Sequence, residues 1–137
     1  MANTAAKLFM AYLESKETHA KYVNDEESIV RVGWNLENTK LNIYFFFGDD
    51  GKDVHLIGDG FCKVPENKQD AILKAVNECN KKFRWMKFVL KDEGEVEVED
   101  DAVIQLDTCA EECFELMIRM CSIVDEAYPI LMKSIWS

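Results

Sequence analysis

Cysteines and histidines are the residues of this chain best suited to metal binding or nucleophilic chemistry. The chain has 5 cysteines and 2 histidines, and Cys109 and Cys113 stand one helical turn apart, with Cys121 two turns further on. A structural zinc site needs four Cys or His ligands at recognisable spacings, and His19 and His55 are far from these cysteines in the sequence. The spacing therefore predicts no metal centre, and Cys113 and Cys121 are expected to pack as small hydrophobic side chains.

Cys109 is then the candidate nucleophile. It falls at the expected start of a helix, where the helix dipole could lower the pKa of its thiol. The sequence contains no GxSxG, HExxH or phosphate-binding glycine-rich motif. Its 2 histidines give few candidates for acid–base catalysis. We therefore expect no enzyme, no catalytic residue and no cofactor. A thiol-dependent enzyme that uses Cys109 stands as a third hypothesis, which would require rapid alkylation at neutral pH.

Carboxylates gather in residues 93–101 and invite interpretation as a cation site. Glu95, Glu97 and Glu99 alternate with valines, which is typical of a strand with one solvated face. The residue order of an EF-hand calcium loop is absent from this run. The run is therefore expected to be a strand whose like charges deter edge-to-edge pairing, and no metal ligand is assigned to it.

The elements that must position these side chains can be read from hydrophobic periodicity and turn residues. The predicted helices cover residues 4–16, 65–83 and 108 onward, and the predicted strands cover residues 28–36, 40–47, 53–64, 84–90 and 95–106. The order is α-β-β-β-α-β-β-α with short connections. We expect one α+β domain over residues 1–137, with three helices packed on an antiparallel sheet.

Three local signals define the ends of the predicted helices. Pro65 suits the first position of the second helix, because proline has a fixed φ and no N–H to leave unpaired. Thr108 and Glu111 stand at the spacing of a capping box at the start of the third helix. Pro129 cannot donate its helical hydrogen bond, so a kink or break is expected near Tyr128.

The strand at residues 40–47 carries apolar side chains on both of its faces. Tyr44 and Phe46 alternate with its other aromatic residues, and Ile57 and Phe61 of the next strand are possible companions on the same face. Either a helix covers this second face, or it is a surface for a partner or a second copy. Both alternatives remain open from the sequence, and the candidate partner-binding residues are Tyr44, Phe46, Ile57 and Phe61.

An alternative hypothesis places a ligand between the second helix and the strand at residues 84–90. Asn80 and Trp85 would supply a polar and an aromatic contact in a small-molecule or metal-responsive sensor. An asparagine in this position more often satisfies nearby backbone groups.

The bulk composition restricts the partners. The net charge of −10 argues against nucleic acids and anionic membranes as partners, because both are negatively charged and bind clusters of Lys and Arg. No apolar run approaches the ~18 residues of a membrane span, and no signal peptide is recognisable. An odd number of cysteines without a CxxC pair favours a reducing compartment, so we expect a cytoplasmic protein whose partner is a protein client or itself, as a homodimer.

The order of elements and several short motifs resemble the bacterial YbjN-like family, which is described as sensory-transduction regulators. The matching residues are Asn77 or Asn80, Lys87 with Phe88, Gly94, the acidic run 95–101, and Asp125, Tyr128 and Pro129. The first strand of the family, around residues 20–23, is the least clear element here. The resemblance implies a fold similar to type III secretion chaperones, which are small acidic dimers that hold partner proteins without catalysis. It therefore implies a chaperone-like, protein-binding or regulatory function.

Overall fold

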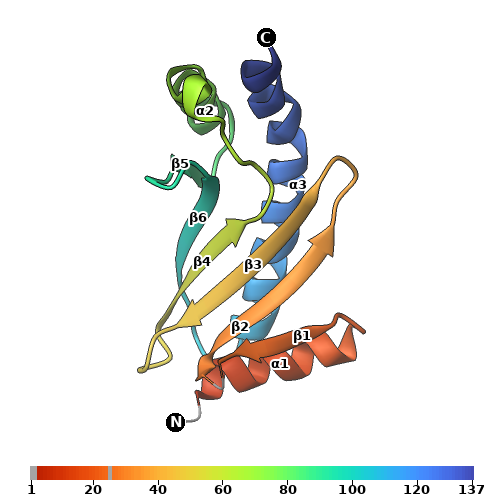
Figure 1. The fold of residues 1–137 in the computed structure, drawn as a ribbon. Coiled ribbons are helices and arrows are strands. Elements are labelled where there is room, and N and C mark those ends of the chain that lie inside the picture. Colours follow the sequence, from red (N-terminus) through yellow and green to blue (C-terminus); the bar gives the residue numbers. More distant parts are fainter. Residues whose placement is uncertain (1–2, 25) are drawn as a thin grey trace.

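The computed structural model describes residues 3–24 and 26–137 and contains three α-helices and a six-stranded sheet (Figure 1). The helices are α1 (Thr4–Ser15), α2 (Gln69–Lys82) and α3 (Cys109–Trp136), and a short 3-10 helix spans Glu66–Lys68. The strands are β1 (Ala20–Val23), β2 (Glu26–Asn35), β3 (Lys40–Phe47), β4 (Asp53–Asp59), β5 (Lys87–Leu90) and β6 (Val96–Val103). The predicted α+β class, the three helices and the order of elements are confirmed.

The sheet is antiparallel throughout, with the strand order β1-β2-β3-β4-β6-β5. Tight hairpins join β2 to β3, β3 to β4 and β5 to β6, and the crossover from β4 to β5 contains α2. The element that was least clear in the sequence is a four-residue edge strand, β1, which pairs with β2. The sheet therefore has two edges, one at β1 and one at β5.

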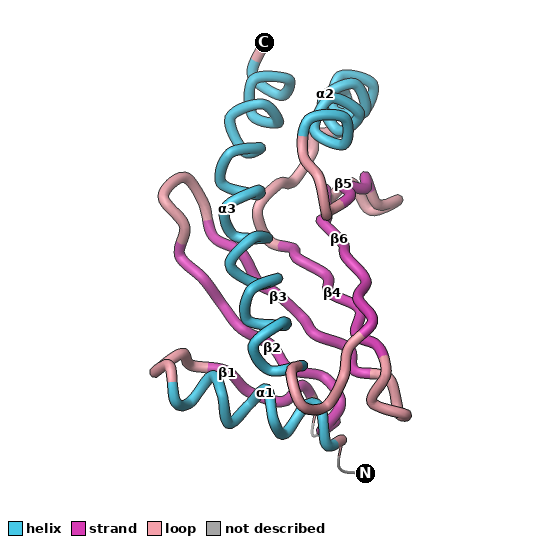
Figure 2. The backbone as a smooth tube through the Cα atoms, turned by 180° about the vertical axis from the view of Figure 1, so that it is seen from behind, coloured by secondary structure: helices cyan, strands magenta, loops and turns pink. Residues whose placement is uncertain are grey.

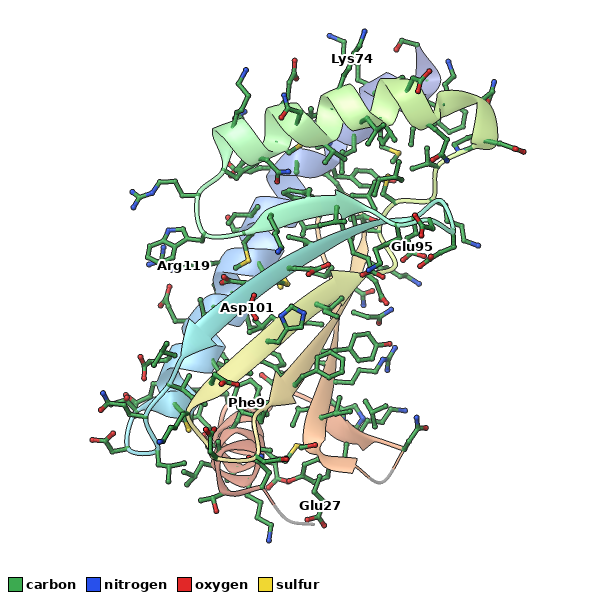
Figure 3. The ribbon with its side chains drawn as sticks, turned by 90° about the vertical axis from the view of Figure 1, so that its left-hand side faces the viewer. Phe9, Glu27, Lys74, Glu95, Asp101 and Arg119 are labelled. Carbon is green, nitrogen blue, oxygen red and sulfur yellow. The ribbon has the colours of Figure 1, made fainter. Side chains whose placement is uncertain are left out.

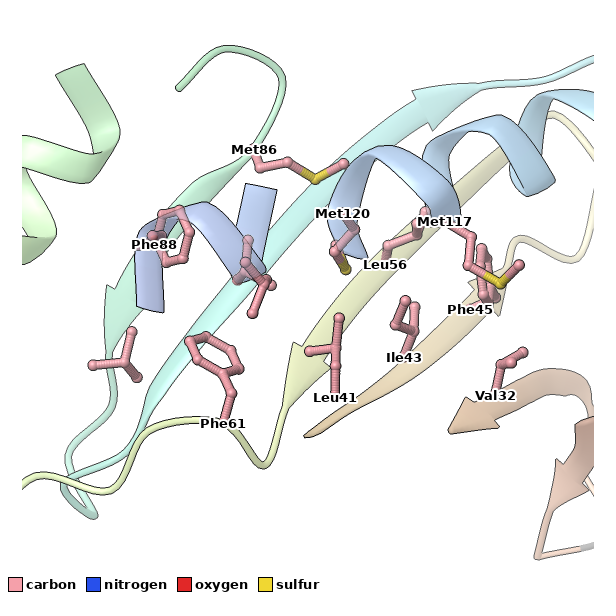
Figure 4. Packing of buried hydrophobic residues seen from close by; sticks show 14 of the residues in the cluster. Val32, Leu41, Ile43, Phe45, Leu56, Phe61, Met86, Phe88, Met117 and Met120 are labelled. Atoms are coloured by element: carbon pink, nitrogen blue, oxygen red, sulfur yellow. The ribbon is translucent and has the colours of Figure 1, made fainter. Parts of the chain in front are cut away.

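One face of the sheet forms the hydrophobic core. On β3 this face carries Leu41, Ile43, Phe45 and Phe47, all of which are buried. The ring of Phe9, from α1, lies 4.5 Å from that of Phe45. Figure 4 shows residues of this face pointing toward methionines of α3.

Helices α1 and α3 lie on this same face, whereas α2 lies along the outer edge of β5. Seen from behind, α3 runs along the length of the sheet and α1 lies across its lower end (Figure 2). The third helix, α2, packs against α3 and β5 at the other end. No helix of the described chain covers the opposite face, which we call the open face. No described helix is both long and apolar enough to cross a membrane.

Phe61 does not belong to the open face, contrary to its assignment from the sequence. Strand β4 ends at Asp59, and Gly60 adopts a φ of 85°, which favours glycine. The resulting turn ends the alternation of the strand and sends Phe61 into the core, where its side chain is 4% exposed and packs edge-on against Phe88. Figure 4 shows Phe61 among the core residues.

Two of the predicted helix ends differ in detail. Pro65 precedes the short 3-10 helix rather than opening α2 directly. Thr108 is the N-cap residue of α3, but its hydroxyl donates to the carboxylate of Glu112, so the capping box with Glu111 does not form.

Of the expected kink or break near Tyr128, the break does not occur, because α3 continues through Pro129 to Trp136. Pro129 itself is exposed, while Ala127 and Leu131 on either side of it are fully buried. Packing of this stripe on the rest of the core offsets the one hydrogen bond that proline cannot make.

Candidate interaction surface

Four half-buried apolar residues lie side by side in the middle of the open face: Ile29, Tyr44, Phe46 and Ile57. We call this set the open-face patch. In the sheet register, Ile29 lies opposite Phe46 on β2 and β3, and Tyr44 lies opposite Ile57 on β3 and β4. Three of the four were predicted as candidates. Ile29 was missed, because its place beside Phe46 depends on the pairing of β2 with β3.

The two aromatic rings of the patch stack along β3. The centroids of Tyr44 and Phe46 lie 6.4 Å apart with an interplanar angle of 28°. The guanidinium of Arg31 lies 5.9 Å from the centroid of Tyr44 and donates to the side-chain oxygen of Asn42 at 2.8 Å. Neighbouring side chains thus hold Tyr44 in place, so a partner would meet an ordered aromatic surface at low entropic cost.

His55 continues the patch toward β6 and was not predicted as part of it. Its ring centroid lies 6.1 Å from that of Phe46. Its Nδ1 lies 2.7 Å from a carboxylate oxygen of Asp101, and its Nε2 lies 3.8 Å from one of Glu99. His55 therefore marks the boundary between the apolar patch and an acidic region on β6.

The acidic region follows the solvated face of β6, as predicted from its alternation. The structure adds Asp59 of β4, which has a carboxylate oxygen within 4.8 Å of oxygens from Glu95 and Glu97. Partial burial, reinforced by the neighbouring carboxylates, raises the pKa of Asp59 and of Glu97 above their ordinary values. Glu95 accepts a hydrogen bond from the backbone N–H of Gly60 at 3.0 Å. The open face is therefore apolar in its centre and negative on its β6 side (Figure 3).

Asn80 serves the backbone of β5. Its side-chain oxygen accepts from the N–H of Phe88 at 2.6 Å, and its side-chain nitrogen donates to the C=O of Phe88 at 3.0 Å. These two bonds satisfy the outward-facing backbone groups of an edge strand. The ligand role of Asn80 stays a prediction that this geometry does not favour, because the oxygen and the nitrogen of its amide both already bond the backbone of β5.

Trp85 lies in the connection from α2 to β5, next to α3, and is 57% exposed. Its φ of 81° is unusual for a residue other than glycine. The guanidinium groups of Arg84 and Arg119 lie 5.6 Å and 5.1 Å from its ring centroid. Trp85 lines a surface hollow of about 420 Å³ between β6 and α3, and Asn80 does not line this hollow.

The cysteines give no support to thiol chemistry. Cys109 is fully buried, and burial, aided by the charge of Glu112, raises the pKa of its thiol instead of lowering it. Burial also raises the pKa of Cys113 and of Cys121 to about 12. All five cysteines are free thiols in the structure. The expected effect of the helix dipole on Cys109 is therefore outweighed by desolvation.

A family model described as "Putative bacterial sensory transduction regulator", named YbjN, matches residues 7–127. No curated protein matches the chain. Within the matched region, Gly94 adopts a φ of 85° in the β5–β6 turn. Asp125 of α3 accepts from the backbone N–H of Asn38 at 2.9 Å, which ties the β2–β3 hairpin to that helix. Gly94 and Asp125, two of the residues that carried the resemblance in the sequence, thus have structural roles.

Solved structures share the fold at low sequence identity. YbjN from E. coli has a TM-score of 0.61 and 8% identity, over 88% of this chain and 89% of that one. The ExsC–ExsE complex gives 0.61 and 14% identity over 100% and 99%. The HopA1–SchA chaperone–effector complex gives 0.54 and 13% identity over 94% of both chains. The chain therefore has the fold of these proteins.

Proposed function

The chain belongs to the YbjN family, and from this premise we propose that it is a non-enzymatic, chaperone-like protein-binding domain that uses the open face of its sheet. Two of the structures that share its fold are protein complexes, one of them a chaperone with its effector. They support a protein partner for this chain, and the open-face patch supplies a surface suited to it.

The single observation that carries the proposal is the uncovered aromatic patch. Tyr44 and Phe46 alternate with Phe45 and Phe47 on β3, and the described helices cover only the second pair. Contiguous apolar surface that no other part of the chain covers is typical of sites for protein partners. Aromatic residues contribute disproportionately to the binding energy of such interfaces. The patch is therefore the centre of the proposed interface.

The acidic region restricts the partner further. Glu99 and Asp101 of β6 lie beside the patch through His55, so a partner that places Lys or Arg there would be attracted to it and a partner with carboxylates would be repelled. A client segment with basic residues meets this condition. A second copy meets it only if its own acidic region is turned away. Five free thiols favour a reducing compartment for such a protein, such as the cytoplasm.

A small-molecule sensor is the weaker candidate. The hollow beside Trp85 supports it, but Asn80, the other proposed contact, bonds the backbone of β5 and does not line this hollow. A rise in melting temperature with a small ligand would favour this function.

The proposal can be tested by capture from a lysate of the source organism, followed by mass spectrometry. Phe46→Asp places a charge in the patch, whereas Leu73→Asp places the same charge on α2, where Leu73 is 50% exposed. We expect one dominant protein that is retained by the wild type and by Leu73→Asp, and lost with Phe46→Asp. Circular dichroism checks that both variants fold. Equal retention by both folded variants would contradict an interface at the patch.

A further inference from the structure

The outer edge of β6 has a strand partner along only part of its length. Strand β5 pairs with residues 96–99 of β6, whereas β4 on the other side pairs with residues 98–103. Before Lys87 the chain turns at Trp85, whose positive φ is incompatible with a continuing strand. Residues 100–103 of β6 therefore form an edge that no described strand of the chain covers. We call this stretch the free edge.

The alternation of an antiparallel ladder shows which backbone groups of the free edge are open. Phe88 lies opposite Val98 and uses its N–H and C=O for Asn80, so this pair is not hydrogen-bonded across β5 and β6. The backbone N–H and C=O groups of Glu97 and Glu99 then point toward β5. Those of Asp101 and Val103 point in the same direction, beyond the end of β5. The N–H of Asp101 is occupied by the side chain of Asp100 at 2.8 Å. Val103 is left with its N–H and C=O directed outward.

The hollow beside Trp85 lies directly next to the free edge. Its walls include Ala102, Val103 and Ile104 from the end of β6, Leu116 of α3, and Trp85. Val103 is 86% exposed, an unusual environment for a strand valine. A strand added along the free edge would direct every second side chain toward α3, as Ala102 does, and therefore over the hollow.

Carboxylates outnumber cations on both sides of the free edge. Glu111, Glu112 and Glu115 of α3 line the hollow together with one cation, Arg119, which is paired with Glu115 at 3.0 Å. On the open-face side, Asp101 lies within the free edge, and Glu99 precedes it. The chain's own β5 shows which side chains suit this edge, because Lys87 lies opposite Glu99 while Phe88 is directed into the core.

We propose that the free edge, residues 100–103, binds an extended peptide segment in which apolar residues alternate with Lys or Arg. The segment continues the line of β5, pairs with the backbone of Val103, and places an apolar side chain in the hollow beside Trp85. This proposal rests on the proposed function, since it names a partner class and a second contact for the same protein-binding role. It uses the mode of recognition in which main-chain bonds supply affinity and pockets supply specificity.

A second copy of the chain does not fit this edge. Two free edges paired about a two-fold axis would bring the carboxylates at positions 100 and 101 of both copies together, with the α3 glutamates of each copy nearby. A basic segment avoids this repulsion. The occupant is therefore a partner peptide instead of the same edge of another copy.

The test uses synthetic nine-residue peptides of alternating Leu and Lys, with alternating Leu and Glu as the charge control. Hydrogen exchange of the intact chain is followed by NMR. On adding the Leu–Lys peptide, we expect exchange of the Val103 N–H to slow by about tenfold or more, because it becomes hydrogen-bonded. The N–H of Ala102, which points toward β4, should change little. The Leu–Glu peptide should have no effect on either.

Backbone variants make the test specific for strand addition. Val103→Pro removes the outward N–H and should weaken Leu–Lys peptide binding about 3- to 10-fold relative to Val103→Ala, which keeps it. N-methyl groups on every second peptide nitrogen should weaken binding when those nitrogens face the free edge. The same groups on the other set of nitrogens, which face away, should leave binding unchanged. If Val103→Pro unfolds the chain, the N-methyl pair on the wild type decides the question alone.

The outcomes separate this proposal from the proposed function. Peptide binding that is lost with Phe46→Asp but unchanged by peptide N-methylation would overturn the free edge and leave the open-face patch as the site. No binding of the Leu–Lys peptide, or no protection of Val103, would also overturn it. Protection of Val103 together with failure of partner capture at the open-face patch would support the free edge and contradict the proposed function as stated.

Discussion

The two faces of β3 differ in their surroundings far more than in their residues. Phe45 is fully buried and packs on Phe9 of α1. Its neighbour Phe46 is half-buried and meets residues of the sheet face, among them Tyr44 and His55. Both faces of the strand are aromatic, but only one is covered by the chain's own helices. The comparison shows that apolar alternation identifies both a surface that the helices cover and one that they leave open, and the open one is the proposed partner surface.

The largest difference between the two faces should appear in stability. Phe45→Ala removes a fully buried ring and should lower the free energy of unfolding by about 3–5 kcal/mol. Phe46→Ala, on the open face, should lower it by no more than about 1.5 kcal/mol, the upper value for an aromatic pair such as that with Tyr44. Urea unfolding followed by circular dichroism measures both. Similar losses for the two variants would mean that the open face is covered in the free chain.

A smaller effect should appear at the β5 edge, which the chain protects itself, in contrast to the free edge of β6. Asn80→Ala leaves the N–H and C=O of Phe88 without their protein partner and should cost about 1–3 kcal/mol of stability. Asn77, one turn earlier on the same helix, is exposed like Asn80 but does not bond the backbone of β5, so Asn77→Ala should cost less than about 0.5 kcal/mol. Equal losses at the two positions would contradict the role assigned to Asn80.

The smallest effect concerns the acidic side of the open face. The pKa of Glu97 is raised in the folded chain, so its charge opposes folding at neutral pH, and this cost is relieved as the pH falls through the raised pKa. Glu97→Gln should therefore be more stable than the wild type at pH 7, by about 0.5 kcal/mol. The advantage should disappear at a pH below the pKa of the unfolded chain. If Glu97→Gln were less stable than the wild type at pH 7, the attraction of the Glu97 carboxylate to Lys91 would outweigh the cost of burying its charge.

The elements could be predicted because their signals are local. The strand at residues 40–47 coincides with β3, and the helical spacing of residues 4–16 places α1 to within one residue. Phe61 was misplaced because the strand predicted over residues 53–64 runs through the Gly-Asp-Gly sequence at residues 58–60, where the chain in fact turns at Gly60. The continuity of α3 through Pro129 likewise depends on tertiary packing that outweighs a local helix breaker.

The candidate surface was predictable only in part, for a related reason. The alternation on β3 identified Tyr44 and Phe46, but Ile29 and His55 join them through strand register, which no single segment specifies. Whether a helix would cover the second face was left open by the sequence. The answer depends on the face of the sheet on which α1 and α3 pack. That face is determined by connections far from β3 in the sequence. The role of Asn80 required knowledge that β5 is an edge strand.

The comparison of the two faces is tested most directly by NMR of isoleucine methyl groups with a soluble paramagnetic probe. Ile29 and Ile57 lie on the open face, Ile43 and Ile72 are fully buried, and Ile118 of α3 is 42% exposed away from the patch. In the free monomer, we predict strong attenuation at Ile29, Ile57 and Ile118. When the captured partner is added, or a dimer forms at higher concentration, Ile29 and Ile57 should become protected while Ile118 stays attenuated. Shielding of Ile57 in the free monomer, or a complex that leaves Ile29 and Ile57 fully attenuated, would contradict the open face as the partner surface.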